Sequence, residues 1–148
     1  MKKAYTNNKE IEIVFIDDLL NEEEYTSAIV IPIFQDKFVM TFNSTNKCWE
    51  FPQCKKEDKE NLLQCVIRET FEETGAILSE INPIGYYKKL KAEDYIKTLV
   101  YIGKIAIFEP KPIWSHTDLV KLFDVLPEDL ETNDGAYKLI IDYIKVKG

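Results

Sequence analysis

The stretch R-E-T-F-E-E-T-G-A at residues 68–76 constrains the fold of this chain more than any other part of the sequence. Its glutamates stand at positions 69, 72 and 73, and this spacing places them within about 100° of one another on a helix. Like charges at this spacing destabilise an isolated helix, and anions are unfavourable in its last turn. Because such violations concentrate at functional sites, the cluster indicates a binding site; a solvated acidic face is the alternative.

A helix over about residues 58–74 should carry this cluster. Asp58 is a suitable N-cap, and Gly75 stands where a helix C-terminus needs a residue that tolerates positive φ. Apolar residues and threonines recur between them at the helical period. The face expected to be buried consists of Leu63, Val66, Ile67, Thr70, Phe71 and Thr74. The glutamates are expected on the side away from Ile67 and Thr70.

Strand patterns surround this helix. Apolar and β-branched runs predict strands at 11–16, 27–34, 37–42, 48–51, 77–81, 84–90, 95–108 and 120–125. Pro32 lacks a ladder donor, so its strand should be bulged or at an edge there, and Gly85 and Gly103 should mark bulges. A last helix is predicted over about 134–146. Strands with one helix in the middle and one at the end predict an α/β sandwich with a mixed sheet.

The composition is typical of a single domain spanning residues 1–148, with 45% hydrophobic and 30% charged residues. No apolar run approaches the roughly 18 residues that span a bilayer, and the start M-K-K-A-Y-T-N-N-K-E lacks the apolar core of a secretory signal. Cys48, Cys54 and Cys65 form no C-x-x-C pair, which favours reduced thiols and a cytoplasmic location. The net charge of −7 argues against general nucleic-acid or membrane binding. Divalent cations could still join an acidic site to a small polyanion.

The spacing around the acidic cluster resembles the signature of the Nudix hydrolases, G-x5-E-x7-R-E-U-x-E-E-x-G-U, where U is a bulky aliphatic residue. Cys54 stands at the first glycine, and Gly75 matches the last one. The charged positions all match at the correct spacing, at Glu60, Arg68, Glu69, Glu72 and Glu73. The sequence W-E-F-P at 49–52 is also similar to that family. The resemblance implies a Nudix-type α/β/α sandwich with a mixed β-sheet.

The resemblance also implies metal-dependent hydrolysis of a nucleoside diphosphate linked to another group. Glu69, Glu72 and Glu73 would bind Mg²⁺ or Mn²⁺, with Glu60 as a more peripheral ligand and the backbone carbonyl of Cys54 as a further one. Arg68 would hold the carboxylates in place by salt bridges. The metal lowers the pKa of a bound water, which attacks one phosphorus. The resemblance therefore assigns catalytic roles to Glu72, Glu73 and Arg68.

The general base and the substrate contacts are less closely defined. The candidates for the base are Glu73, Glu93, Asp94, Glu109 and Asp118. The residues predicted to bind substrate are Lys55, Trp49, Tyr87 and Lys89. The sequence Y-Y-K-K-L-K at 86–91 could stack on bases and attract phosphates, or it could be an ordinary strand with a basic edge. Trp49 could stack on a base or lie in the core. His116, the only histidine, is expected to be structural.

The chain departs from the family signature at Gln53 and Cys54, where two glycines usually stand. The family glycine allows a close backbone approach, and a Cβ there would penalise positive φ by roughly 1–2 kcal/mol. Asp58 and Lys59 replace the usual Pro-Gly, which favours an earlier helix start. An alternative to an active enzyme is therefore a weakly active or inactive Nudix-fold domain that binds nucleotides as a sensor.

Within the family, the layout is similar to the MutT-type nucleoside triphosphate pyrophosphohydrolases and, among them, to the YtkD-like branch. The sequences I-G-Y-Y at 84–87 and V-L-P-E-D-L at 125–130 carry this similarity. It implies cleavage of a nucleoside triphosphate, including an oxidised purine such as 8-oxo-dGTP, to monophosphate and pyrophosphate. The sequence F-P-Q at 51–53 is similar to RNA 5′-pyrophosphohydrolases, an alternative that the negative charge disfavours. The expected partner is a small-molecule nucleotide, and a homodimer is compatible with the resemblance.

Overall fold

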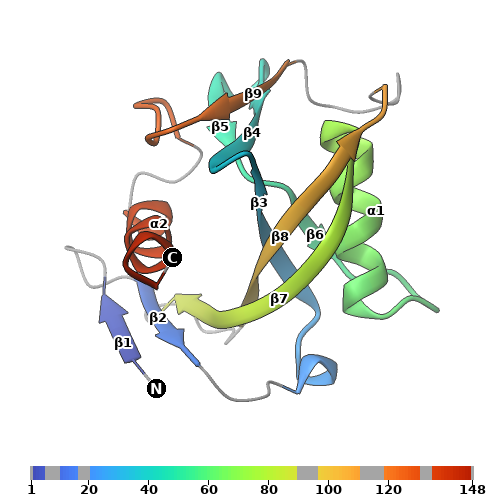
Figure 1. The fold of residues 1–148 in the computed structure, drawn as a ribbon. Helices are drawn as coiled ribbons and strands as arrows, with labels where there is room; N and C mark the ends of the chain where they lie inside the picture. Colours follow the sequence, from blue (N-terminus) through green and yellow to red (C-terminus); the bar gives the residue numbers. More distant parts are fainter. Residues whose placement is uncertain are drawn as a thin grey trace.

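The computed structural model describes residues 2–5, 11–16, 21–89, 97–110, 119–130 and 135–147. The described chain forms strands and helices in a fixed order (Figure 1). The first half contains β1 (Lys2–Tyr5), β2 (Ile11–Phe15), the 3-10 helix η1 (Glu22–Glu24), β3 (Ser27–Phe34), β4 (Lys37–Asn43), β5 (Cys48–Glu50) and β6 (Gln53–Lys55). The second half contains α1 (Leu62–Thr74), β7 (Ala76–Lys89), β8 (Thr98–Phe108), β9 (Leu119–Phe123) and α2 (Ala136–Lys147).

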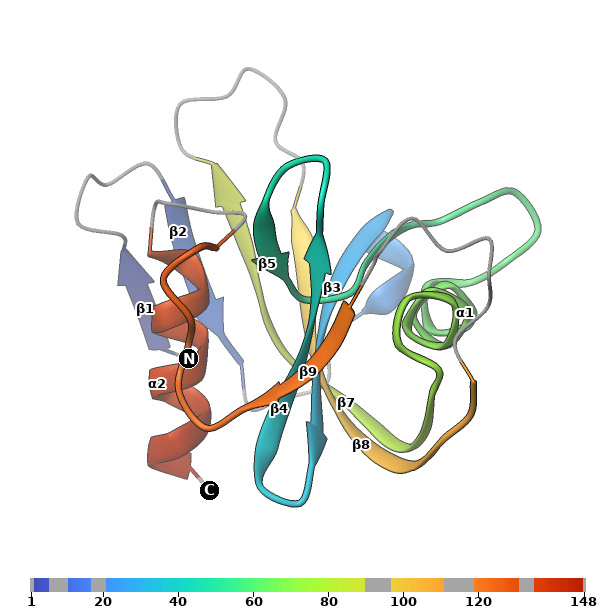
Figure 2. The ribbon, with the colours of Figure 1, turned by 90° about the horizontal axis from the view of Figure 1, so that it is seen from above.

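The strands form one mixed sheet in the order β1-β2-β7-β8-β3-β4-β5, with β6 paired to β3 and β9 paired to β4. The pairing of β3 with β8 is parallel, whereas β7 pairs antiparallel with both β2 and β8. The helices α1 and α2 lie on opposite sides of this sheet (Figure 2). The predicted α/β/α sandwich with a mixed sheet is therefore confirmed.

Strand β3 shows how the sequence builds a core on each side of the sheet. Its run S-A-I-V-I-P-I-F is apolar on both faces, as a strand covered on both sides requires. Ile29 and Ile31 belong to the core beneath α2, whereas Ala28 and Val30 belong to the core beneath α1. Successive side chains of a strand point to opposite faces, so one strand supplies both layers.

Pro32 lies inside β3 without a bulge, so the prediction of a bulge there is wrong, whereas the predicted edge is confirmed locally because neither β4 nor β6 pairs with Pro32. The parallel register with β8 continues through Pro32, which lies opposite Gly103. On the other side of β3, β6 pairs with residues 27–29 and β4 pairs only with Ile33 and Phe34. Pro32 therefore occupies the interval between these two partners, where no ladder donor is needed.

Helix α1 begins at Leu62, later than predicted, and its N-cap is Asn61 rather than Asp58. Asn61 and Gln64 form a capping box, in which each side chain accepts a 2.8 Å hydrogen bond from the backbone of the other. Lys59 lies in the preceding turn with φ of 70°, so the expected early helix start is also wrong. The predicted end is confirmed, because Gly75 adopts the left-handed conformation with φ of 76°.

Strand β7 is one long strand, although two strands were predicted for 77–81 and 84–90. Register shifts against β8 near Leu78 and between Pro83 and Gly85 bend it without ending the pairing. Gly85 therefore marks a bulge as predicted, whereas Gly103 pairs in register with Ile81. The short strands β1 and β6 were not predicted. The C-terminal helix is confirmed near its predicted position, and neither described helix is long and apolar enough to cross a membrane.

We predict that Gly85→Ala destabilises the protein by about 1–3 kcal/mol, because the added methyl group overpacks the β2–β7 pair. A Cβ at Gly85 would stand 2.1 Å from the backbone oxygen of Val14, which cannot move without disturbing β2. Gly103→Ala is the matched control, since its Cβ would meet only the flexible Leu78 and Val30 side chains, at 3.0 Å or more. Urea unfolding should show the larger loss for Gly85→Ala; equal losses would contradict this account.

Candidate active site

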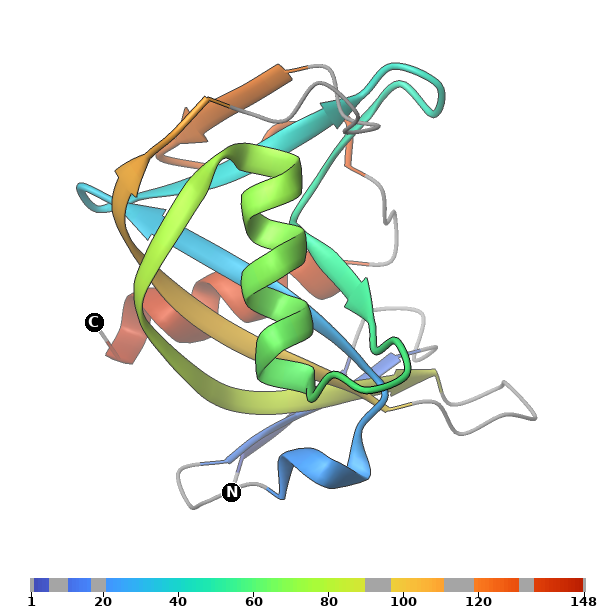
Figure 3. The ribbon, with the colours of Figure 1, turned by 90° about the vertical axis from the view of Figure 1, so that its right-hand side faces the viewer.

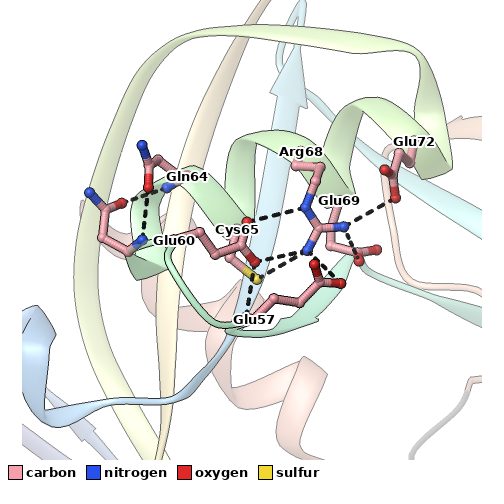
Figure 4. Close-up of polar contacts among 8 residues, drawn as sticks. Glu57, Glu60, Gln64, Cys65, Arg68, Glu69 and Glu72 are labelled. Atoms are coloured by element: carbon pink, nitrogen blue, oxygen red, sulfur yellow. Dashed lines mark hydrogen bonds and ion pairs between the residues drawn. The ribbon is translucent and has the colours of Figure 1, made fainter.

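The guanidinium of Arg68 is the centre of the acidic cluster on α1 (Figure 4). It contacts four carboxylates, and the shortest contacts are 2.9 Å from Nη1 to Glu69 Oε1 and 2.9 Å from Nη2 to Glu60 Oε1. Nε also donates to the second oxygen of Glu60 at 3.3 Å, so that pair is bidentate. Glu72 lies 3.4 Å from Nη1, and Glu57 lies 3.5 Å from Nη2. One cation thus offsets the repulsion that the sequence concentrates here.

This network ties the segment before α1 to the helix. The hydrogen bond from Arg68, with a second one from the backbone N–H of Glu57 at 3.0 Å, lowers the pKa of Glu60 to about 2. Contacts with Glu60 and Glu69 raise the pKa of Arg68 above its ordinary value, against the opposing effect of burial. Glu60 and Arg68 are therefore both ionised at neutral pH, and their pair fixes the entry to the helix.

A cavity of about 310 Å³ lies beside the helix, where Glu69 and Glu73 face residues from other elements. Its lining consists of Asn43, Asn46, Glu50, Phe51, Gln53, Glu69 and Glu73. Glu50 comes from β5 and is 8% exposed, and Glu73 is 4% exposed. The cavity thus joins three carboxylates and three carboxamides, with no lysine or arginine in the described lining.

The donor atoms of this cavity fit a divalent cation such as Mg²⁺ or Mn²⁺, because such hard ions prefer carboxylate and carbonyl oxygens. Within the described residues, no three Asp, Glu, Cys or His side chains already converge on one point as a ligand set. Glu69 is hydrogen-bonded to Arg68 at 2.9 Å, and Arg68 is not part of the cavity lining. Glu50, Glu69 and Glu73 are the residues that could hold a metal in this cavity.

The buried stripe of α1 differs from the predicted face. Leu63 and Ile67 are 37% and 46% exposed, whereas Cys65 is fully buried. The stripe consists of Leu62, Cys65, Val66, Thr70, Glu73 and Thr74. Glu73 was expected on the side away from Thr70 but lies within the same buried stripe. The helix therefore presents Glu69 and Glu73 to the cavity and Glu72 to Arg68.

Cys54 lies in β6 opposite Ala28 of β3, with its side chain in the core beneath α1. The described non-glycine residues with positive φ are Gln35, Asp36, Lys47 and Lys59. The expected strain at Cys54 is therefore wrong, because a residue in a strand needs no glycine. Burial raises the pKa of the Cys54 thiol to about 11, so the side chain stays protonated at neutral pH.

Three of the residues predicted to bind substrate, Trp49, Tyr87 and Lys55, do not line this cavity. Trp49 packs against Phe42 and Phe123, with ring centroids 5.2 and 4.8 Å apart. Tyr87 packs against the core beneath α2, and Lys55 is exposed on β6. The backbone of Lys89 pairs with Ile11, but its side chain lies outside the described residues.

The remaining predicted acids are also apart from the cavity or outside the described chain. Glu109 is exposed after β8, where its backbone N–H donates to Gly75 at 2.7 Å. Residues Glu93, Asp94, His116 and Asp118 lie outside the described residues.

Sequence reasoning assigned no role to Glu50, Asn43 and Asn46. The signal for Glu50 was the W-E-F-P stretch, in which the two-residue period of β5 buries Cys48 and Glu50 together. The asparagines belong to the turn between β4 and β5, and that turn approaches α1 only through tertiary packing. No local pattern could have paired them with Glu69.

Comparisons of the sequence and of the fold with known proteins agree on one family. Residues 24–135 match the family model of the NUDIX domain. The chain is 34% identical over 132 residues to YtkD of Bacillus subtilis (strain 168), which is named provisionally as an 8-oxo-dGTP diphosphatase; the match covers 89% of this chain and 81% of that protein. It is also 34% identical over 73 residues to the 8-oxo-dGTP diphosphatase of Buchnera aphidicola subsp. Acyrthosiphon pisum, covering 49% of this chain and 59% of that protein. The crystal structure of a mutant of the Bacillus subtilis pyrophosphohydrolase BsRppH matches with a TM-score of 0.79 and 25% identity, over 100% of this chain and 98% of that one.

We predict that the stabilising effect of Glu60 is lost in acid. Its pKa is lowered from 4.5 to about 2 in the folded protein, so its contribution is complete above about pH 5 and declines as pH falls toward 2. The free energy of unfolding of Glu60→Gln, measured with a chelator present, should therefore differ from wild type most at pH 6 and least near pH 2. Glu57→Gln is the control, because that side chain is 71% exposed and its ion pair contributes little. A Glu60→Gln difference independent of pH would contradict this reading.

We also predict that Cys54→Gly lowers stability by about 1–3 kcal/mol and leaves kcat no higher than in wild type. The substitution removes a buried side chain from the α1 core and places glycine in a strand, with no positive φ to relieve. Lys55→Gly provides the control for backbone entropy, because Lys55 is exposed on the same strand. A large gain in kcat for Cys54→Gly would contradict this account and show that a glycine at position 54 favours catalysis.

Proposed function

Because the chain belongs to the Nudix family of hydrolases, which act on phosphoanhydride bonds, we propose that it is a Mg²⁺- or Mn²⁺-dependent pyrophosphohydrolase of nucleoside triphosphates. The observation that carries this proposal is the cavity shared by Glu50, Glu69 and Glu73. Its carboxylates come from a strand and a helix that face each other, next to the signature sequence. Nudix hydrolases generally use a divalent metal, and these oxygen donors suit one.

The proposed roles follow from the positions of the acids. Glu69, Glu73 and Glu50 hold the metal, which when bound supplies positive charge for the phosphates and a more acidic water. Glu73 lies in the cavity and is almost fully buried, so we assign it the acceptance of the proton from the attacking water. Arg68 orients Glu69 through the 2.9 Å contact between Nη1 and Oε1.

Glu60, Glu72 and the carbonyl of Cys54 are proposed as further ligands. Glu60 and Glu72 share the guanidinium of Arg68, so the same cation that positions Glu69 also positions them. Cys54 adjoins Glu69 across a narrow crevice between β6 and α1. The shared contacts with Arg68 support Glu60 and Glu72 in this role, and the closeness of Cys54 to Glu69 supports the carbonyl.

For the substrate we propose a nucleoside triphosphate with an oxidised purine, such as 8-oxo-dGTP. The names of the two relatives at 34% identity support this choice. A second candidate is the 5′-triphosphate end of RNA, raised by the F-P-Q sequence at 51–53. The whole-chain similarity to BsRppH, a pyrophosphohydrolase, supports that candidate.

We predict that Glu69→Gln and Glu73→Gln each lower kcat at least about 100-fold, because each removes an anionic ligand or base from the cavity. Assays of pyrophosphate and phosphate release with Mg²⁺ or Mn²⁺ measure this, with 8-oxo-dGTP, dGTP, GTP and 5′-triphosphorylated RNA as substrates. The control is Glu80→Gln, because Glu80 is exposed on β7 and should leave kcat unchanged.

The outcomes separate the candidates. Preference for 8-oxo-dGTP over dGTP supports nucleotide sanitation, and preference for RNA ends supports the second candidate. Full activity in Glu69→Gln and Glu73→Gln would reject the proposed site. A wild-type protein that turns over no substrate in this panel, yet binds Mg²⁺ and nucleotide, would reject the catalytic role in favour of a nucleotide sensor.

A further inference from the structure

The side chain of Asn43 lines the cavity that contains Glu50, Glu69 and Glu73, called the carboxylate cavity below. The oxygen of its amide is hydrogen-bonded to the backbone. Its Oδ1 accepts hydrogen bonds from the backbone N–H groups of Thr45 at 3.0 Å and Asn46 at 3.2 Å. Both partners are donors, so the oxygen of the amide must face the turn, and the orientation of the amide is fixed. This arrangement is an Asx turn between β4 and β5, and it leaves Nδ2 as the polar group of Asn43 directed away from the turn.

The charges of the cavity show what such a donor could bind. The described lining has carboxylates at Glu50, Glu69 and Glu73 and carboxamides at Asn43, Asn46 and Gln53, but no lysine or arginine. A polyphosphate held at the carboxylates through a cation still has oxygens that the cation does not reach. Those oxygens need N–H donors, and in the described lining the side-chain N–H groups belong to the carboxamides.

Gln53 differs from Asn43 in how its amide is held. Its Nε2 donates to the hydroxyl of Tyr137 on α2 at 3.1 Å, and the same hydroxyl accepts from the backbone N–H of Phe51 at 3.4 Å. Its amide nitrogen is therefore hydrogen-bonded to a residue of α2. Asn46 lines the cavity from the same turn as Asn43, but its side chain is exposed. Among the described residues, no hydrogen bond holds that side chain in one orientation. Asn43 is thus the carboxamide whose donor is oriented by its own turn.

We propose that Asn43 is a substrate-binding residue whose Nδ2 donates a hydrogen bond to a phosphate oxygen of the nucleotide. The proposal rests on the proposed function, because it places the polyphosphate chain in the carboxylate cavity. A pre-oriented neutral donor adds binding without adding a cation that would compete with the metal for the carboxylates.

The experiment separates this role from a purely structural turn. Asn43→Asp keeps the acceptor oxygen that the turn needs but replaces the donor with a second oxygen and adds a charge. Asn43→Ser keeps a shorter acceptor and removes the donor without adding a charge. Asn46→Asp is the matched control, because it adds the same charge to the same cavity and leaves Asn43 intact. Thermal unfolding of each variant reports on the turn itself.

Binding is measured by calorimetry with imidodiphosphate plus Mg²⁺, a non-hydrolysable probe that has no base or sugar. We expect Asn43→Asp and Asn43→Ser to weaken binding by about tenfold or more, as the loss of a hydrogen bond to a charged group predicts. Asn46→Asp should change it by less than about threefold, and the melting temperatures of the Asn43 variants should stay near wild type. In turnover, KM for nucleotides should rise in the Asn43 variants while kcat changes less.

Three results would overturn the proposal. Unchanged binding in both Asn43 variants would leave Asn43 as a turn residue. Equal losses in Asn43→Asp and Asn46→Asp, with Asn43→Ser unaffected, would make the effect one of charge alone. Unchanged binding of the probe together with altered discrimination between nucleobases would move the contact from phosphate to base. Because the probe is not hydrolysed, its binding tests Asn43 even if the wild-type enzyme fails to turn over any nucleotide.

Discussion

The guanidinium of Arg68 is the interaction on which the organisation of the site depends. Glutamates at i, i+3 and i+4 would repel one another on an isolated helix, and α1 carries three of them in its last two turns. Arg68 contacts two of these, Glu69 and Glu72, and reaches back to Glu60 before the helix. A bidentate, planar cation can serve several carboxylates at once, which a lysine ammonium cannot do with the same geometry. Arg68 therefore offsets, within the chain itself, part of the repulsion among the carboxylates of the acidic helix.

The sheet determines where that helix can stand. α1 packs over β6, β3 and β7 (Figure 3). The short strand β6 carries Cys54 into the same core cluster as Cys65 of the helix. The chain then enters α1 through the turn containing Lys59 and the capping box at Asn61. On the other side of Pro52, Glu50 reaches the cavity from β5. Two short strands flanking one proline thus contribute Glu50 and Gln53 to the cavity, and Arg68 contacts Glu69 from outside its lining.

The sequence predicted those parts of the molecule that local chemistry determines. The end of α1 at Gly75, the position of α2 and the apolar run of β3 each follow from residue type and period. The N-cap was also a local choice, which the prediction missed: Asp58 and Asn61 are both good N-caps, but only Asn61 has Gln64 three residues after it to complete a capping box. The other failures lie where tertiary packing decides. Leu63 and Ile67 resemble core residues, but the helix turns Cys65 and Glu73 inward instead. Glu50 could be placed beside Glu69 only once strand pairing was known.

The distribution of charge explains why the site contains both an arginine and a cavity without cations. Arg68 contacts Glu69, but it does not belong to the described lining of the cavity, whose polar side chains are carboxylates and carboxamides. Under the proposed function, an arginine in this lining would compete with a divalent ion for the carboxylates. Arg68 instead contacts Glu69 from outside the lining, while Glu69 still borders the cavity. Under the proposed function, this acidic protein of net charge −7 would bind a polyanion through a metal ion, which would supply the positive charge that the described lining lacks.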